Sequence, residues 1–389
     1  MSARPGTRRW LRLFAGLALS ASACGGGSGG GTSIDEAGSG ATVATTPAAD
    51  RSATSPAEPG CQPAPLELRA ATVLVVGIGD GTTVDDPLAS EVAGLGVGGV
   101  TLRPPNIVGA GQVRALIDGL RQRSPGQLLV GVDEEGGRVS RLRPILGDTD
   151  SARVLGQRPP AEIEDTAAER AAVMRDLGFD VTFAPVVDAD GGPADGAIGD
   201  RSFAAAPDQA GALASSFAAG LGEAQMVAVA KHFPGQGGLE DSHDGSVVSD
   251  AALAEVEATA AGFAPLVDAE VPAVMMSHVT FSALGPLPAS LEPAAYSLLR
   301  SQGFDGVAIT DSLGMGAIVQ RWPTPEATVM ALAAGADMVL ANQGDQATAM
   351  RDAVVAAVTE GRLSEARLDE AVARVRTLLG DEPATMACD

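Results

Sequence analysis

The sequence predicts an α/β fold, a (β/α)8 barrel forming a single domain. From residue 72 onward, short apolar runs rich in β-forming residues alternate with longer helical patterns, as in repeated βα units around a parallel sheet. The 389 residues leave room for eight such units with long loops. An open doubly wound sheet is the alternative, but residues 77–81 lack the spacing of a dinucleotide-binding glycine motif.

Eight strands are expected, and each is short and apolar enough to be buried on both faces of the sheet. Their ranges are 72–78, 98–102, 128–133, 181–187, 226–230, 273–277, 306–310 and 337–340. Helical patterns lie between them at 113–123, 162–177, 209–223, 253–267 and 293–300. A last helix is expected at 364–379, because Ser364 and Glu365 suit a helix N-terminus and an apolar face follows, made up of Leu368, Val372, Val375 and Leu378.

The first sixty residues are predicted to lie outside this domain. Residues 1–24 combine a basic start, a short apolar run and small residues, as an export signal does. Ala21-Ser22-Ala23-Cys24 resembles a lipobox, in which Cys24 carries the lipid, and residues 7–11 leave a twin-arginine address open beside the general secretory route. Residues 25–60 are too poor in large apolar side chains to fold and are expected to form a tether, so the domain spans 61–389.

Three cysteines bear on the redox setting of the chain. If Cys24 carries a lipid, Cys61 and Cys388 remain as a pair in an exported, oxidising environment. We predict that they form a disulfide, because the two ends of a domain often lie close together. Two free thiols are the alternative.

The net charge of −23 argues against nucleic acid and anionic membrane surfaces as partners, since no basic patch follows residue 24. The apolar run of the signal is too short to span a bilayer, so a lipid anchor is the expected membrane contact. Aromatic residues are scarce, which leaves recognition to polar contacts.

Candidate functional residues follow predicted strands, where the barrel places active sites. Asp133 and Arg141 come after the third strand, Lys231 to His243 after the fifth, and Asp311 after the seventh. Two of the three histidines lie in the fifth segment, and Asp241 precedes His243 by two positions. A carboxylate beside an imidazole suits proton transfer near neutral pH. Histidines that merely satisfy loop backbone groups are the alternative.

Several motifs in order resemble glycoside hydrolase family 3. They are Asp133-Glu134-Glu135-Gly136-Gly137-Arg138-Val139, Ile198-Gly199-Asp200-Arg201-Ser202-Phe203, Lys231-His232-Phe233-Pro234-Gly235, Asp241-Ser242-His243 and Thr310-Asp311-Ser312-Leu313. The Asp-Ser-His loop points to the bacterial β-N-acetylglucosaminidase branch, and the resemblance runs from about residue 72 to 380.

The resemblance implies a retaining mechanism with Asp311 as nucleophile, His243 as general acid and base, and Asp241 as the group that orients His243. It also implies sugar binding by Asp133, Arg141, Arg201, Lys231 and His232. Arg138 is expected to be structural, His278 to be either structural or part of the site, and Gln236 departs from the histidine of many relatives. No metal or cofactor is expected.

The expected substrate is a glycan or muropeptide ending in β-linked N-acetylglucosamine, cleaved by a lipid-anchored monomer on the outer face of the bacterial membrane or in the cell envelope. Three alternatives remain. They are a phosphorylase on the same glycosides, a metal-dependent hydrolase using His232, Asp241, His243 and Asp244, and a sugar-binding lipoprotein without catalysis.

Overall fold

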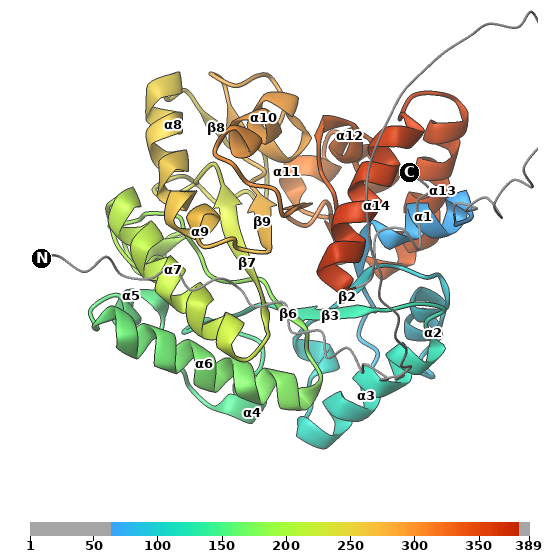
Figure 1. The fold of residues 1–389 in the computed structure, drawn as a ribbon, viewed down its shortest axis with the longest axis horizontal. Helices are drawn as coiled ribbons and strands as arrows, with labels where there is room; N and C mark the ends of the chain where they lie inside the picture. The colour runs from blue at the N-terminus through green and yellow to red at the C-terminus, as the bar shows by residue number, and fades with distance from the viewer. Residues whose placement is uncertain (1–63, 381–389) are drawn as a thin grey trace, which may run out of the picture. The chain divides into compact units, whose positions relative to one another are not determined.

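The computed structural model describes residues 64–380, and within them eight parallel strands form one sheet (Figure 1). These strands are β1 (Leu74–Gly77), β2 (Gly99–Leu102), β3 (Leu129–Val132), β6 (Val181–Thr182), β7 (Val227–Phe233), β9 (Ala273–Met276), β11 (Val307–Thr310) and β12 (Val339–Ala341). All eight predicted strands are present. The fourth ends early, at Thr182, and the first begins later than expected because Thr72 belongs to a helix.

The sheet closes into a barrel. Its order is β11-β9-β7-β6-β3-β2-β1-β12, with parallel pairing throughout. The two end strands meet at a parallel bridge between Ile309 and Met338. There the N–H of Thr310 donates to the carbonyl of Met338 at 3.2 Å, and the N–H of Met338 donates to that of Ala308 at 3.1 Å. The predicted (β/α)8 barrel is therefore confirmed.

Helices surround the barrel (Figure 1). Within residues 64–380 they are α1 (Leu66–Thr72), α2 (Pro87–Gly94), α3 (Ala110–Arg123), α4 (Arg143–Leu146), α5 (Ala152–Leu155), α6 (Pro160–Leu177), α7 (Pro207–Glu223), α8 (Leu253–Ala260), α9 (Ala264–Asp268), α10 (Pro293–Ser301), α11 (Gly316–Val319), α12 (Thr324–Ala334), α13 (Ala347–Thr359) and α14 (Glu365–Leu379). Two short pairs lie outside the barrel: β4 (Glu134–Gly136) with β5 (Val139–Ser140), and β8 (Val248–Ser249) with β10 (Thr280–Phe281).

The predicted helix at 253–267 is wrong in one respect, because a 3-10 turn at Ala261–Phe263 divides it into α8 and α9. Pro265 has no N–H to continue the helical hydrogen bonding. The predicted cap of the last helix is confirmed, since the Ser364 side chain accepts a hydrogen bond from the N–H of Arg367. Sequence reasoning missed α12, whose residues are buried around most of its circumference and so lack an amphipathic pattern.

The barrel interior is a separate apolar core. Alternate strand residues such as Val75, Val229 and Ile309 point into it, and Phe183 joins them. Val375 and Leu378, both on α14, pack against this cluster, so the last helix covers one end of the barrel. Closing that end leaves the carboxyl ends of the strands as the face where a site can form.

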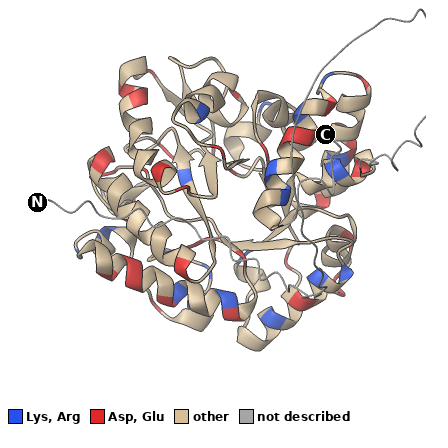
Figure 2. Ribbon diagram, in the orientation of Figure 1, with Lys and Arg blue, Asp and Glu red and all other residues tan. Residues whose placement is uncertain are grey.

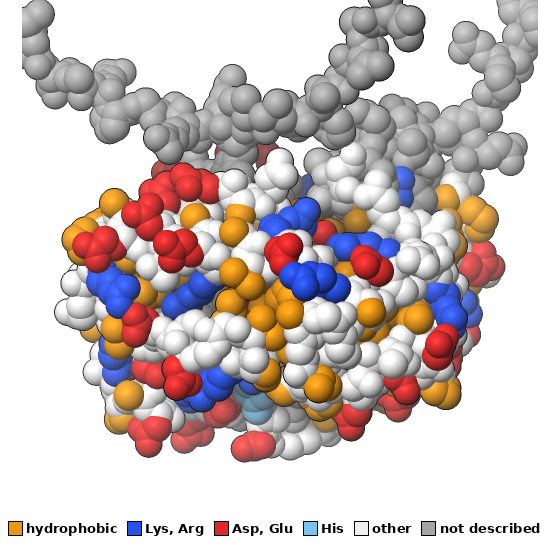
Figure 3. Space-filling model, turned by 90° about the horizontal axis from the view of Figure 1, so that it is seen from below, with side chains coloured by type: hydrophobic (Ala, Val, Ile, Leu, Met, Phe, Trp, Pro, Cys, Tyr) orange, Lys and Arg blue, Asp and Glu red, His pale blue; other side chains and the backbone are white. Residues whose placement is uncertain are grey.

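Most charged residues lie on the helices and loops (Figure 2). On the face drawn in Figure 3, acidic and basic side chains are interspersed with apolar ones. Within residues 64–380, no helix is long and apolar enough to cross a membrane. The predicted export signal, the tether, Cys24 and the Cys61–Cys388 pair lie outside the described residues.

Candidate active site

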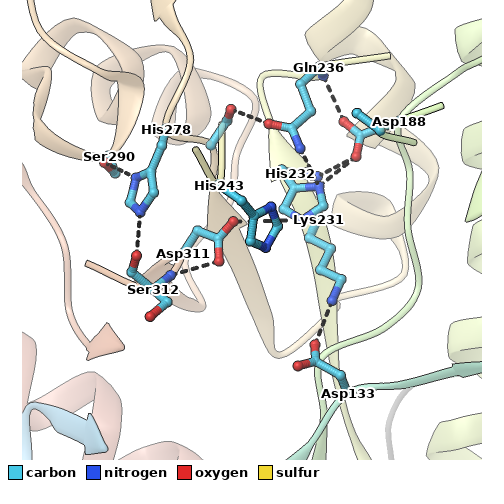
Figure 4. Close-up of polar contacts among 12 residues, drawn as sticks. Asp133, Asp188, Lys231, His232, Gln236, His243, His278, Ser290, Asp311 and Ser312 are labelled. Carbon is cyan, nitrogen blue, oxygen red and sulfur yellow. Dashed lines mark hydrogen bonds and ion pairs between the residues drawn. The ribbon is translucent and has the colours of Figure 1, made fainter. Parts of the chain in front are cut away.

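Several candidate residues lie close together where the strands end, among them Asp133, Lys231 and Asp311 (Figure 4). Asp133 follows β3, Lys231 and His232 belong to the end of β7, and Asp311 follows β11. β7 extends to Phe233, so Lys231, His232 and Phe233, which were expected in a loop, are held by the sheet. This placement agrees with the expectation that functional side chains lie at the carboxyl ends of the barrel strands.

Asp311 presents one carboxylate oxygen to the site. Its Oδ1 accepts a hydrogen bond of 2.7 Å from the N–H of Ser312, while its Oδ2 lies 3.9 Å from Nε2 of His232. Burial by itself raises the pKa of Asp311, but His232, His278 and the Ser312 N–H together hold it below its usual value. Asp311 is therefore an ionised carboxylate at neutral pH, as a nucleophile must be.

His232 is oriented by Asp188, a residue that sequence reasoning did not select. Oδ2 of Asp188 accepts a hydrogen bond from the backbone N–H of His232 at 3.1 Å and lies 2.6 Å from Nδ1 of the same residue. Because a carboxylate only accepts, Nδ1 carries a proton, and Nε2 faces Asp311. Asp188 is wholly buried. Its sequence signal was a carboxylate just after a buried segment, the same signal that marked Asp133 and Asp311.

A chain of four alternating charges crosses the floor of the site. Nζ of Lys231 lies 2.9 Å from Asp133 and 2.7 Å from Glu135, and Glu135 also binds Arg201 through two hydrogen bonds of 2.8 and 2.9 Å. Burial lowers the pKa of Lys231, but Asp133 and Glu135 raise it overall. Sequence reasoning quoted Glu135 as part of a motif without giving it a role. It fixes both cations, and Asp133, whose side chain is one-third exposed, remains open to a ligand.

The buried Glu135 should make stability depend on pH. Burial by itself raises its pKa, but Arg201 and Lys231 hold it well below its usual range. The unfolded chain therefore binds a proton here at a higher pH than the folded protein, and this contribution to stability declines as pH falls below about 4.3. We expect the difference in unfolding free energy between the wild type and Glu135→Gln to shrink between pH 6 and 3. Urea titrations measure it, and a constant difference would contradict the assignment.

Asp241 and His243 form a pair on the loop after β7. Oδ1 of Asp241 accepts a hydrogen bond of 2.9 Å from the backbone N–H of His243 and lies 2.5 Å from its Nδ1. Burial by itself raises the pKa of Asp241, but these two donors hold it below its usual value. The ionised carboxylate places the ring proton on Nδ1, which leaves Nε2 to carry the exchangeable proton.

Two of the remaining arginines differ in whether their side chains are already bound within the protein. Arg141 makes no side-chain hydrogen bond or ion pair within residues 64–380, so its guanidinium is open to a ligand. Arg138 binds Asp200 at 2.8 Å and the carbonyl of Ile198 at 2.9 Å, as expected for a structural residue.

His278 is fully buried between Ser290 and the carbonyl of Ser312, and burial lowers its pKa. It therefore supports the backbone next to Asp311. Gln236 accepts a hydrogen bond from Ser277 through its side chain, and its N–H donates to Asp188. The backbone of Gln236 is thus linked to the group that orients His232.

His232 and His243, two of the ligands of the metal alternative, are each paired with a different carboxylate. His232 is held by Asp188 and His243 by Asp241. Within the described range 64–380, no group of three or more His, Cys, Asp and Glu side chains is arranged to hold a metal ion.

The barrel brings a buried carboxylate, Asp311, and a carboxylate-paired histidine, His243, to one site, an arrangement that suits the class of O-glycoside hydrolases. Residues 66–378 match the model of the glycosyl hydrolase family 3 N-terminal domain. The chain belongs to this family, and the predicted family is confirmed.

Similar proteins indicate the branch of family 3 to which the chain is related. The β-hexosaminidase LpqI of Mycobacterium tuberculosis is 37% identical over 393 residues, which cover 96% of this chain and 98% of that protein. Its solved structure gives a TM-score of 0.74 at 36% identity, over 82% of this chain and 94% of the other. The structure of a family 3 β-N-acetylglucosaminidase from a Paenibacillus species gives a TM-score of 0.77 at 30% identity, over 83% of this chain and 64% of the other. The predicted enzyme class, that of the β-N-acetylhexosaminidases, is confirmed.

Proposed function

We propose that this protein is a retaining exo-β-N-acetylglucosaminidase that removes terminal N-acetylglucosamine from cell-wall fragments. The observation that carries the proposal is the Asp241–His243 pair, whose loop is hydrogen-bonded to the segment that follows Asp311. The barrel thus supplies both a nucleophile and a proton carrier. The names of the relatives support the amino sugar as substrate.

In the first step, Oδ2 of Asp311 attacks the anomeric carbon while the bond from that carbon to the leaving oxygen breaks. Protonated His243 gives its Nε2 proton to the leaving oxygen, and Asp241 stabilises the imidazolium beforehand. The product is a covalent glycosyl-enzyme. A histidine adds no second anion beside Asp311, so the nucleophile keeps its lowered pKa.

In the second step, neutral His243 takes a proton from water, the water oxygen attacks the anomeric carbon, and Asp311 leaves as a carboxylate. Two displacements at the same carbon restore the starting configuration. Asp133, Arg141, Arg201, Lys231 and His232 hold the terminal sugar in this scheme, since carboxylate, guanidinium and ammonium groups match hydroxyl and acetamido partners.

The deciding measurement compares an aryl N-acetyl-β-glucosaminide with the matching aryl β-glucoside. We expect a higher kcat/KM on the N-acetylglucosaminide, with Asp311→Ala as the control for contaminating activity. Equal or greater activity on the glucoside would contradict the substrate assignment. Adding phosphate to the same assay tests the phosphorylase alternative, which requires phosphate to accelerate turnover and to appear in a sugar phosphate.

We also propose that the enzyme is exported and anchored through lipid on Cys24, with Cys61 and Cys388 joined by a disulfide. The signal-like start and the placement of these cysteines in the sequence support this. Mass spectrometry of the protein purified from membranes without reductant tests both points. An unmodified Cys24 would exclude the anchor, and two free thiols would exclude the disulfide.

Asp188→Asn should lower kcat/KM by about 10²-fold. The amide loses the charge-assisted hydrogen bond and no longer fixes the His232 proton on Nδ1. The matched control is Asp180→Asn, since Asp180 lies just before β6 and binds Arg121 and Arg175 instead of a candidate site residue. We expect the control to lose stability and keep kcat/KM. Wild-type kcat/KM for Asp188→Asn would show that His232 needs no orienting group.

A further inference from the structure

The loop that carries His243, residues 236–247, has to hold an exposed side chain in one position. At one end the N–H of Gln236 donates to Asp188 at 2.7 Å, and at the other the carbonyl of Val247 accepts from Thr280 at 2.9 Å. The His243 side chain between them is 66% exposed. Side-chain packing therefore contributes little to its position, and backbone contacts of the loop have to supply the rest.

Those contacts come from α11 and the residue that follows it. The carbonyl of Ser242 accepts from the N–H of Ala317 at 3.3 Å, that of His243 from the N–H of Gly316 at 2.8 Å, and that of Asp244 from Nε2 of Gln320 at 2.7 Å. Three consecutive loop carbonyls are thus bound by one short segment. Two of the donors are N–H groups in the first turn of α11, which have no partner within the helix.

The approach of the two backbones depends on glycine. A Cβ at residue 316 would lie 2.7 Å from the carbonyl oxygen of His243 and 2.7 Å from the carbonyl carbon of Asp244. Any larger residue would push the loop away. Gln320 is exposed, and its side-chain amide donates to the loop.

We propose that Gly316 and Gln320 are positioning residues that hold His243 over Asp311. The same segment contains the nucleophile five residues before Gly316, so a single stretch of chain sets both reacting groups. Docking of the loop onto α11 then fixes where the Nε2 proton of His243 is delivered. This inference rests on the proposed role of His243 as acid and base.

Gln320→Ala removes one donor without touching the sugar-binding residues. We expect kcat on a substrate with a poor leaving group to fall about five-fold, in line with the loss of one hydrogen bond, while KM stays nearly unchanged. Gln320→Glu should cause at least the same loss, because a carboxylate repels the Asp244 carbonyl. Arg321→Ala is the matched control, since its guanidinium lies over the ring of Trp322 and, within residues 64–380, makes no hydrogen bond or ion pair.

A double-mutant cycle separates positioning from a general structural effect. In a His243→Ala background, Gln320→Ala should have no further effect, because there is no imidazole left to position. An equal loss in both backgrounds, or no loss in the wild-type background, would overturn the inference. Failure of the proposed function would appear differently, as full activity in the single His243→Ala variant.

Discussion

Replacing Asp311 with alanine is expected to lower kcat by at least about 10⁴-fold on every glycoside substrate. The variant has no replacement nucleophile at this position. Within residues 64–380, no other carboxylate lies within 4 Å of His232 Nε2, the atom that Asp311 faces. The neighbouring residues remain, so binding of the sugar should persist. Steady-state kinetics on an aryl N-acetyl-β-glucosaminide measure the loss, and product binding measured by calorimetry checks that the site is intact.

The same variant tests the stereochemistry. Azide is small enough to enter the space left by the carboxylate, and one displacement by azide at a β-glycoside gives the α-glycosyl azide. We expect azide to restore turnover of an activated substrate with this inverted product. The wild type, which uses two displacements, should first release the β-anomer, as NMR can show. An α-anomer from the wild type would exclude the glycosyl-enzyme.

Replacing His243 with alanine should give a loss that depends on the leaving group. For a poorly leaving alcohol or sugar, kcat/KM is expected to fall about 10³-fold, since proton donation to the leaving oxygen is lost. For an activated aryl glycoside the first step needs little help from a proton. The second step still needs a base, so the glycosyl-enzyme should accumulate and produce a burst of the aryl product.

Glu240→Gln is the control for this variant, because Glu240 is exposed on the same loop. We expect it to behave like the wild type with both kinds of leaving group. Equal losses for His243→Ala on good and poor leaving groups would show that His243 acts on something other than the departing oxygen. Unchanged turnover in both steps would show that it is not the acid and base.

The barrel could be predicted because each strand has a local signal. Runs such as Leu74–Gly77 and Val307–Thr310 are mostly apolar and buried at every position, and burial on both faces favours this composition. α12 escaped because burial on nearly all sides removes the polar stripe that marks a surface helix. The 3-10 turn at Ala261–Phe263, which interrupts the predicted helix, comes just before Pro265. Because a proline disturbs only the neighbouring turn of a helix, this interruption also has a local signal in the sequence.

The candidate site could be predicted only in part. Asp311, Lys231 and His243 stood in motifs that the family resemblance covered. Glu135 was present in a quoted motif without a role, and Asp188 was not selected, because a carboxylate alone does not show what it binds. Asp188 and His232 are 44 positions apart in the sequence, and Glu135 and Arg201 are 66 apart, so only the closed barrel brings the members of each pair together.

The sequence by itself determined the order of the strands, the residue types at their carboxyl ends, the predicted family and the reaction those residues suit. Only the tertiary structure decided which group orients which. It placed Asp188 behind His232, enclosed Glu135 between two cations, and docked the His243 loop onto α11. Hydrogen bonds and ion pairs between distant segments depend on distance and angle within a fraction of an ångström. Neither composition nor spacing along the chain contains that information.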